Sequence, residues 1–300
     1  MIAGRIFQRF FHSTRSSFTT NNKSLLATLR QKTGYTFSNC KKALELHNYD
    51  LSKAEDWLQS QAKAEGWAKI GKLKGRAANE GLIALINNNN LATMVEVNCE
   101  TDFVARNDNF QSMIAAVAQA TLGYATDKGM YGHEFCKIIL AKPDLSNLKT
   151  IDGEHTLADL IAWHVNLLGE NIALKRAVCW CVRDEMQISG YIHPPFLHKT
   201  GVLMGKFGSL VCYRKLPEPA LTVDVTLNDV GSMLAKQIVG MNPESIGNKE
   251  EDKPSEDEDS ETKLIFQPMI TDTDQIVGEF LDQNGVQVID YIRFHCGESL

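Results

Sequence analysis

The stretch GLIALINNNNLATMVEVNCETDFVARNDNF, residues 81–110, decides the fold of this chain. Two aliphatic, β-branched runs flank four asparagines, which predicts a β-hairpin because asparagine tolerates the positive φ angles of tight turns. Asp108 and Gln111 can then cap a helix whose apolar residues follow helical spacing. Together with the elements described below, this pattern predicts an α+β fold in which helices pack on antiparallel sheets.

Three short helices are predicted ahead of this stretch, in residues 23–62. Gly34 is placed to end the first helix, and Ser38 can cap the second. Ser52 and Glu55 have the spacing of a capping box that opens the third helix. We therefore expect a compact three-helix module with a small core, whose exposed face can serve as a docking surface.

A basic stretch, residues 63–80, joins this module to the rest of the chain. Glycines interrupt it, and lysines and an arginine make it positively charged. No aromatic platform for stacking bases accompanies these charges. The sequence therefore favours a solvated, mobile connector over a nucleic-acid site.

Two similar α+β subdomains are predicted after the connector, residues 81–168 and residues 169–300. Successive strands are expected between residues 177 and 214, and Thr273 is expected to cap a late helix that ends at Gly285. The acidic stretch 248–262 has no aromatic or large aliphatic side chain. Because it cannot bury enough apolar surface to order itself, we expect it to be disordered.

Bulk composition excludes several classes of protein. The chain has 300 residues and a formal net charge of −6, which argues against a protein that mainly binds nucleic-acid phosphates. No apolar run is long enough to span a membrane. Residues 1–20 carry three arginines, a cluster of hydroxyl side chains and no acid. This pattern predicts a mitochondrial transit peptide, and a disordered basic tail is the alternative.

Patterns for catalysis and for ligand binding are weak. Neither a Walker loop nor a dinucleotide-binding glycine motif is present, so we expect no direct nucleotide binding and no cofactor. Cys99 and Asp102 lack the elbow and the paired base that nucleophilic catalysis needs. His193 and His198 lie in a proline-containing loop without carboxylate or thiol neighbours, which favours an interaction loop over a metal site.

Polar residues alternate along the second strand of the predicted hairpin and fall on one face. They are Glu96, Asn98, Glu100 and Asp102. Clustered carboxylates could bind magnesium, but like charges at a strand end are also an ordinary solvated edge, which we favour. Phe103 follows directly, and composition alone would place its ring in the core of the chain.

Several segments resemble the elongation factor Ts family, in the order that the family has them. TGYTFSNCKKALELHNYDLSKAEDWL, residues 33–58, is similar to the N-terminal helical module of that family, which is related to ubiquitin-associated domains. VEVNCETDFVARNDNFQ, residues 95–111, resembles a second and more specific signature. Residues 189–208 and 288–298 continue the match, so that the resemblance covers most of residues 23–298.

The resemblance implies a translation factor that is not an enzyme but acts as a nucleotide-exchange factor. Its partner would be mitochondrial elongation factor Tu in the mitochondrial matrix, and neither nucleic acid nor a membrane would be bound. By match, Phe103 would enter the G domain beside its magnesium site and promote GDP release, while Asp102 holds polar contacts. Thr101 and Val104 complete this motif.

Other contact residues follow from the same resemblance. Lys41 and Lys42 of the helical module would grip another part of the G domain, and His193 would contact the partner from the second subdomain. Bacterial members carry a helical protrusion where this chain has residues 248–262, so a contact made through that protrusion is not carried over to this chain. A ubiquitin-binding adaptor acting through the helical module is the alternative function.

Overall fold

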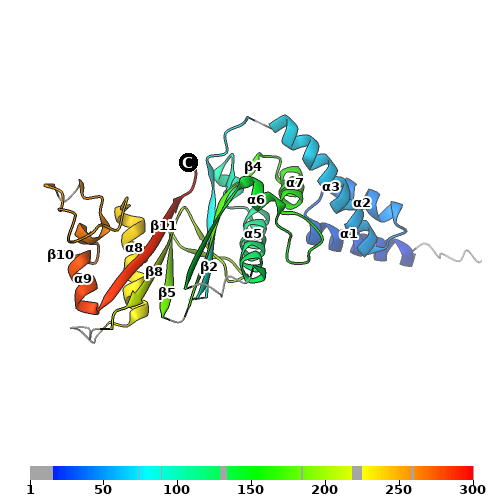
Figure 1. The fold of residues 1–300 in the computed structure, drawn as a ribbon. Coiled ribbons are helices and arrows are strands. Elements are labelled where there is room, and N and C mark those ends of the chain that lie inside the picture. The colour runs from blue at the N-terminus through cyan, green and yellow to red at the C-terminus, as the bar shows by residue number, and fades with distance from the viewer. Residues whose placement is uncertain are drawn as a thin grey trace, which may run out of the picture.

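The computed structural model describes residues 16–73, 75–88, 90–128, 134–183, 185–217, 225–257 and 260–299. Its helices and strands form layers, with a helical module at one end (Figure 1). Most of the predicted transit peptide, residues 1–20, lies outside the described residues. The described part contains no helix that is long and apolar enough to cross a membrane.

The helical module consists of α1 (Ser16–Thr33), α2 (Phe37–Leu46) and the first part of α3 (Leu51–Leu73). Its core is formed by apolar side chains from all three helices, among them Leu29, Cys40, Leu44 and Leu58. Thr36, and not Ser38 as predicted, caps α2, because its hydroxyl accepts a hydrogen bond from the Asn39 backbone N–H. The predicted capping box of Ser52 and Glu55 is wrong as well, because α3 begins at Leu51 and Asp50 accepts from the Lys53 backbone N–H at 3.1 Å. The three predicted helices themselves are observed.

Helix α3 does not stop at residue 62 but continues to Leu73, so the predicted mobile connector is wrong for residues 63–73. Tertiary packing explains the difference. Gly66 lies against the backbone of Ala162 so closely that a Cβ atom there would be 1.8 Å from the Ala162 carbonyl oxygen. Lys63 also pairs with Asp159 at 2.7 Å. Glycine therefore serves close helix packing here, and the module is fastened to the core.

The larger sheet has the strand order β3-β4-β2-β1-β7-β6, and its pairs are antiparallel. The predicted hairpin is confirmed, because its two strands pair along their whole length. Strand β4 pairs with β2, so this sheet crosses the subdomain boundary that we placed at residue 169. The strands are β1 (Glu80–Asn87), β2 (Leu91–Cys99), β3 (Phe135–Ala141), β4 (Ile172–Val182), β6 (Phe196–Leu197) and β7 (Leu203–Gly205).

Helices cover one face of this sheet and bury it in the first core, as predicted from the spacing of Phe110, Met113 and Ile114. The long helix of this layer is capped by Asn107 rather than by Asp108, because the Asn107 side chain accepts from the Asn109 backbone N–H. The helices are α4 (Asp102–Ala105), α5 (Asp108–Asp127), α6 (Lys142–Asn147) and α7 (Leu157–Leu168).

A second sheet, in the order β11-β8-β5, packs on the other face of the larger one. Apolar residues of both sheets form the core between them, including Met94, Trp180 and Leu210. Helices α8 and α9 cover the outer face of the second sheet through a third core. These elements are β5 (Met186–His193), β8 (Phe207–Lys215), α8 (Leu227–Met241), α9 (Val277–Asn284) and β11 (Val286–His295). The α+β class with antiparallel sheets is thus confirmed.

Thr273 does not cap a helix, contrary to the prediction. It lies in β10 (Asp272–Ile276), which pairs with β9 (Pro268–Met269) after a short 3-10 helix, η3 (Leu264–Phe266). Helix α9 starts later, without a side-chain cap, and its first N–H donates to the Gln267 carbonyl oxygen. Its predicted end at Gly285 is confirmed, with a positive φ of 61°.

The acidic stretch is ordered where it is described, residues 248–257 and 260–262, so the expectation of disorder is wrong there. Polar contacts replace the missing apolar burial. Glu261 is buried and accepts from the backbone N–H groups of Ser255 and Lys263, at 2.7 and 2.8 Å. Lys263 also pairs with Asp252 at 2.8 Å. The carboxylates of this loop therefore act as internal hydrogen-bond acceptors.

Candidate functional site

The residues after β2 form an outward-pointing tip, which we define as residues 101–106. Thr101 caps the four-residue helix α4, because its hydroxyl accepts a hydrogen bond from the Val104 backbone N–H at 3.3 Å. Val104 and Ala105 turn toward the first core, whereas the Phe103 ring is 79% exposed. Composition alone suggested that Phe103 packs in the core of the chain, but the structure places its ring outside. A large exposed aromatic on a short capped helix is suited to insertion into a partner.

Asp102 lies beside this ring at the first turn of α4. Its carboxylate accepts from the Arg106 guanidinium at 2.8 Å, and both side chains are partly exposed. Such an exposed pair within one helix contributes only about 0.3–0.5 kcal/mol to stability. The pair is therefore easily opened, and the carboxylate remains available for polar contacts outside the chain.

The base of the tip is held by two carboxylates that the sequence did not single out together. Glu170 accepts from the Thr101 hydroxyl at 2.7 Å and from the Thr101 backbone N–H at 3.1 Å. Glu100 accepts from the Asn171 backbone N–H at 2.7 Å and contacts Arg76 at 3.4 Å. Each carboxylate thus bonds the opposite chain segment, and we call these four residues, 100, 101, 170 and 171, the end clasp.

The polar face of β2 is buried, contrary to the expected solvated edge. Glu96 is 0% exposed and Asn98 is also buried, because β2 lies between β1 and β4 and the second sheet covers it. Arg176 donates to Glu96 at 2.7 Å, and the Gly297 backbone N–H donates to it at 2.8 Å. Glu96 therefore belongs to an internal ion pair, while Glu100 and Asp102 lie farther out, where the strand ends.

Cys99 is not placed to act as a nucleophile. It is fully buried, and burial raises the pKa of its thiol to about 12. A thiol with such a pKa carries almost no thiolate at neutral pH, and thiolate is the reactive form. No group of three or more His, Cys, Asp or Glu side chains suited to a metal occurs among the described residues. The described residues of the tip thus form a contact surface, and Cys99 lies buried beneath it.

His193 is exposed at the end of β5. Its Nδ1 atom lies 3.2 Å from the phenol oxygen of Tyr191, within hydrogen-bond distance. It does not form a metal site with His198, which is buried and bonded to Thr200 and Ser112. Phe196 and Leu197, next to His193, are exposed as well. This loop thus presents an imidazole and two apolar side chains together.

His193 and the tip lie at the same end of the two sheets. The Lys206 backbone N–H donates to the His193 carbonyl oxygen at 3.0 Å, and the Lys206 side chain pairs with Glu80. Glu80 in turn faces Cys99 across β1 and β2, directly before the tip. A partner that covers the tip can therefore reach the His193 loop from the same side.

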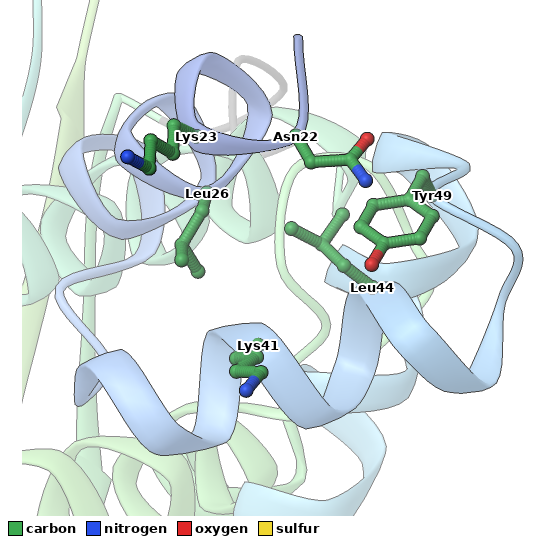
Figure 2. A pocket seen from close by; sticks show the side chains of 6 residues that line it. All are labelled: Asn22, Lys23, Leu26, Lys41, Leu44 and Tyr49. Atoms are coloured by element: carbon green, nitrogen blue, oxygen red, sulfur yellow. The ribbon is translucent and has the colours of Figure 1, made fainter. Parts of the chain in front are cut away.

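Lys41 and Lys42 are exposed on α2, but they face different surroundings. Lys41 borders a small pocket of about 110 Å³ between α1, α2 and the turn that follows α2 (Figure 2). Lys42 lies 5.6 Å from the centre of the Trp57 ring. The other residues that line the pocket are Asn22, Lys23, Leu26, Leu44 and Tyr49. Apolar walls with two lysines suit an apolar side chain that has an acidic neighbour.

The helical module also approaches the tip. Gly34, just before α2, lies against the side chains of Leu167 and Asn109, and Asn109 is in the first turn of α5 after the tip. Phe37, at the start of α2, is exposed. The segment before α2 therefore lies near the start of α5, which follows the tip in the chain.

A larger groove, of about 660 Å³, lies between α3 and the segment that leads into α7. Carboxylates such as Asp56, Asp152 and Glu154 dominate its lining, and Trp163 lies among them. It contains none of the predicted contact residues. The groove therefore does not contribute to the candidate site.

Glu170 and Glu100 are the site residues that sequence reasoning missed in this role. Gly169 gives a local signal for this position, because it ends α7 in the left-handed conformation with φ 78°. The chain changes direction there, and Glu170 is the first residue after the change. The pairing of Glu170 with Thr101, however, joins segments 69 residues apart. Only the register of β2 and β4 reveals it.

Two family models match the chain. Residues 8–68 match the model described as Elongation factor Ts, mitochondrial, N-terminal, and residues 100–261 match the model Elongation factor TS. The first covers the helical module, and the second contains the tip, the end clasp and His193. The matched regions thus include every predicted contact residue.

Curated relatives agree with these matches. The chain is 43% identical to mitochondrial elongation factor Ts of Aedes aegypti, over 94% of this chain and 91% of the relative. It is 41% identical to the Drosophila melanogaster protein of that name, over 99% and 94%, and 40% identical to the Homo sapiens protein, over 97% and 88%. Alignments of this length cover both the module and the layered core.

Proposed function

This chain belongs to the elongation factor Ts family, and from that premise we propose that it is the guanine-nucleotide exchange factor of mitochondrial elongation factor Tu. In this proposal the tip enters the G domain, disturbs the magnesium and phosphate site, and lets GDP leave. The names of the relatives support a mitochondrial location, and we propose the matrix, where translation elongation takes place.

The 79% exposure of Phe103 is the single observation that carries the proposal. Exposure of an apolar ring to water is unfavourable in the isolated protein. The same free energy becomes favourable for binding when a partner covers the ring. Covering it contributes about 1.5–3 kcal/mol, which corresponds to about a ten- to hundredfold change in an equilibrium or a rate.

Reciprocal coupling then accounts for exchange. A factor that binds the nucleotide-free partner more tightly lowers nucleotide affinity by the same ratio by which nucleotide lowers the affinity of the factor. The burial of one ring is a modest part of that coupling. The other contacts must therefore supply much of the binding free energy, while Phe103 directs it at the nucleotide site.

Two exposed surfaces are suited to holding the partner. The pocket beside Lys41 and the ring-stacked Lys42 present positive charge on the module, and the His193 loop presents polar and apolar groups together. The His193 loop lies at the same end of the sheets as the tip. A ubiquitin-binding adaptor would use the module alone and would leave the match over residues 100–261 without a role.

The release of fluorescent GDP from mitochondrial elongation factor Tu tests the proposal. Wild-type chain is expected to accelerate release, and Phe103→Ala is expected to lower the maximal rate about ten- to hundredfold. Ile151→Ala is the matched control, because Ile151 is likewise an exposed apolar residue but lies in the loop before α7. An unchanged rate for Phe103→Ala would refute the proposed role of the tip.

A further inference from the structure

The backbone ladder between β2 and β4 stops just before the tip. Its last paired residues are Cys99 and Ile172. If the antiparallel register continued, Glu100 would face Asn171, and Thr101 would face Glu170. The end clasp therefore occupies the two positions at which the ladder would have gone on.

Side chains take over the bonding at these two positions. The carboxylate of Glu170 accepts from the Thr101 backbone N–H at 3.1 Å, and that of Glu100 accepts from the Asn171 backbone N–H at 2.7 Å. A carboxylate can thus satisfy a backbone donor without holding the two backbones in sheet geometry. The chain is free to leave the sheet at Thr101 and to turn into α4.

The second bond of Glu170 orients the cap of α4. A hydroxyl group has one proton and two lone pairs. The Thr101 proton points to Glu170 at 2.7 Å, because an ionised carboxylate only accepts, and so the lone pairs are left for the Val104 backbone N–H at 3.3 Å. Glu170 thereby fixes both the backbone and the hydroxyl rotor of the residue that starts the helix.

We propose that Glu170 is a positioning residue for exchange, which acts by setting the direction in which Phe103 leaves the molecule. This inference rests on the proposed function, since it assigns a role within the same site. A helix of four residues does not hold itself in water, because too few hydrogen bonds repay its nucleation. The direction of Phe103 therefore depends on anchors outside α4, and Glu170 provides two of them.

Loss of these anchors has a characteristic kinetic result. Glu170→Ala leaves Thr101 without its acceptor, so that Phe103 samples more directions and a smaller fraction of encounters is productive. We expect the maximal rate of GDP release to fall about five- to tenfold. The half-saturating concentration of the factor is expected to change little, because the helical module and the His193 loop still bind the partner.

A double-mutant cycle on the full chain tests this assignment, with fluorescent GDP on mitochondrial elongation factor Tu as the readout. The variants are wild type, Glu170→Ala, Phe103→Ala and the double variant. If Glu170 acts through Phe103, Glu170→Ala slows wild type but has no further effect in the Phe103→Ala background. Glu279→Ala in α9 is the matched control, because it removes an exposed carboxylate far from the tip (Figure 1).

Glu170→Gln separates positioning from mere charge. The two Thr101 donors bond different oxygens of Glu170, and glutamine replaces one of these oxygens with an NH2 group that cannot accept. The maximal rate of Glu170→Gln is therefore expected between those of wild type and Glu170→Ala. Glu170→Gln also serves if Glu170→Ala fails to fold, which thermal unfolding reveals. Charge removal elsewhere, as in Glu279→Ala, is expected to leave the rate unchanged.

The outcomes distinguish the two proposals. If Phe103→Ala slows release but Glu170→Ala and Glu170→Gln match wild type, the positioning role is wrong and the proposed function stands. The positioning role is also wrong if Glu170→Ala costs the same factor in the Phe103→Ala background, because Glu170 would then act independently of the ring. If Phe103→Ala itself has no effect, both proposals fail.

Discussion

Glu96 and Phe103 lie close together in the chain and occupy opposite environments. The carboxylate of Glu96 is 0% exposed, whereas the apolar ring of Phe103 is 79% exposed. Each reverses the usual preference of its residue type. The buried charge has a full set of partners in Arg176, Asn98 and Gly297, whereas the ring has no cover in the described part of the chain. A reversal with partners indicates internal structure, and a reversal without them indicates a surface that awaits a partner.

The buried end of this comparison gives the largest expected effect. Arg176→Met removes the cation from a carboxylate that remains buried, so the free energy of unfolding should fall by about 3–5 kcal/mol. Arg214→Met is the matched control in the second sheet, where the arginine is partly exposed and 3.9 Å from Glu134. Its cost should be at most about 1 kcal/mol. Equal losses in urea unfolding would show that Glu96 does not depend on its cation.

The pH dependence of stability tests the comparison at His164, a buried polar group without a charged partner. His164 is buried in α7, and burial lowers its pKa to about 4 from an ordinary value of 6.5. Above pH 6.5 the imidazole is neutral in both states. As pH falls from 6.5 to 4, the unfolded chain binds a proton that the folded chain excludes, so stability falls by about 3 kcal/mol at about 1.4 kcal/mol per pH unit.

Urea unfolding of wild type and His164→Leu between pH 7 and pH 4 measures this contribution. Other groups titrate equally in both proteins, so the variant should lose about 3 kcal/mol less stability over that range than wild type. Parallel pH profiles would mean that the folded protein accepts a charged His164. The interior would then tolerate a charge without an ion-pair partner, contrary to what Glu96 suggests.

The exposed end gives the smallest expected effect on stability. Phe103→Ala should change the free energy of unfolding by no more than about 0.5 kcal/mol, because the ring has few internal contacts to lose. Phe110→Ala, in the same segment but fully buried in α5, should cost about 3–5 kcal/mol. A large loss of stability for Phe103→Ala would place its ring inside and end the contrast with Glu96.

Local patterns in the sequence were sufficient for most elements. The spacing of apolar residues predicted α5, and the asparagines predicted the hairpin of β1 and β2. These signals lie within one helix or one turn, where chemistry and conformation are coupled directly. The fold class therefore followed from the sequence.

Features that depend on distant segments were not predictable. Gly66 signals a break in a helix by itself, but in the structure it allows α3 to approach Ala162. The polar face of β2 indicated a solvated edge, because nothing in the nearby sequence shows that Arg176 and Gly297 donate hydrogen bonds to Glu96. Glu170 likewise gains its role only from the register of two strands. The contact residues came from a resemblance, and the structure adds how one of them is held.

Glu96 also sets a condition on the order in which the polypeptide can fold. One of its hydrogen bonds comes from Gly297, which is 201 residues later in the chain. A polypeptide made or translocated from its N-terminus has β2 long before it has that donor. Strands β5 and β8 can already cover the inner face of the larger sheet, but until residue 297 is present the Glu96 carboxylate lacks one of its hydrogen-bond donors. Completion of the layered core is therefore a late event that requires nearly the whole sequence, as expected where long loops must close before their contacts form.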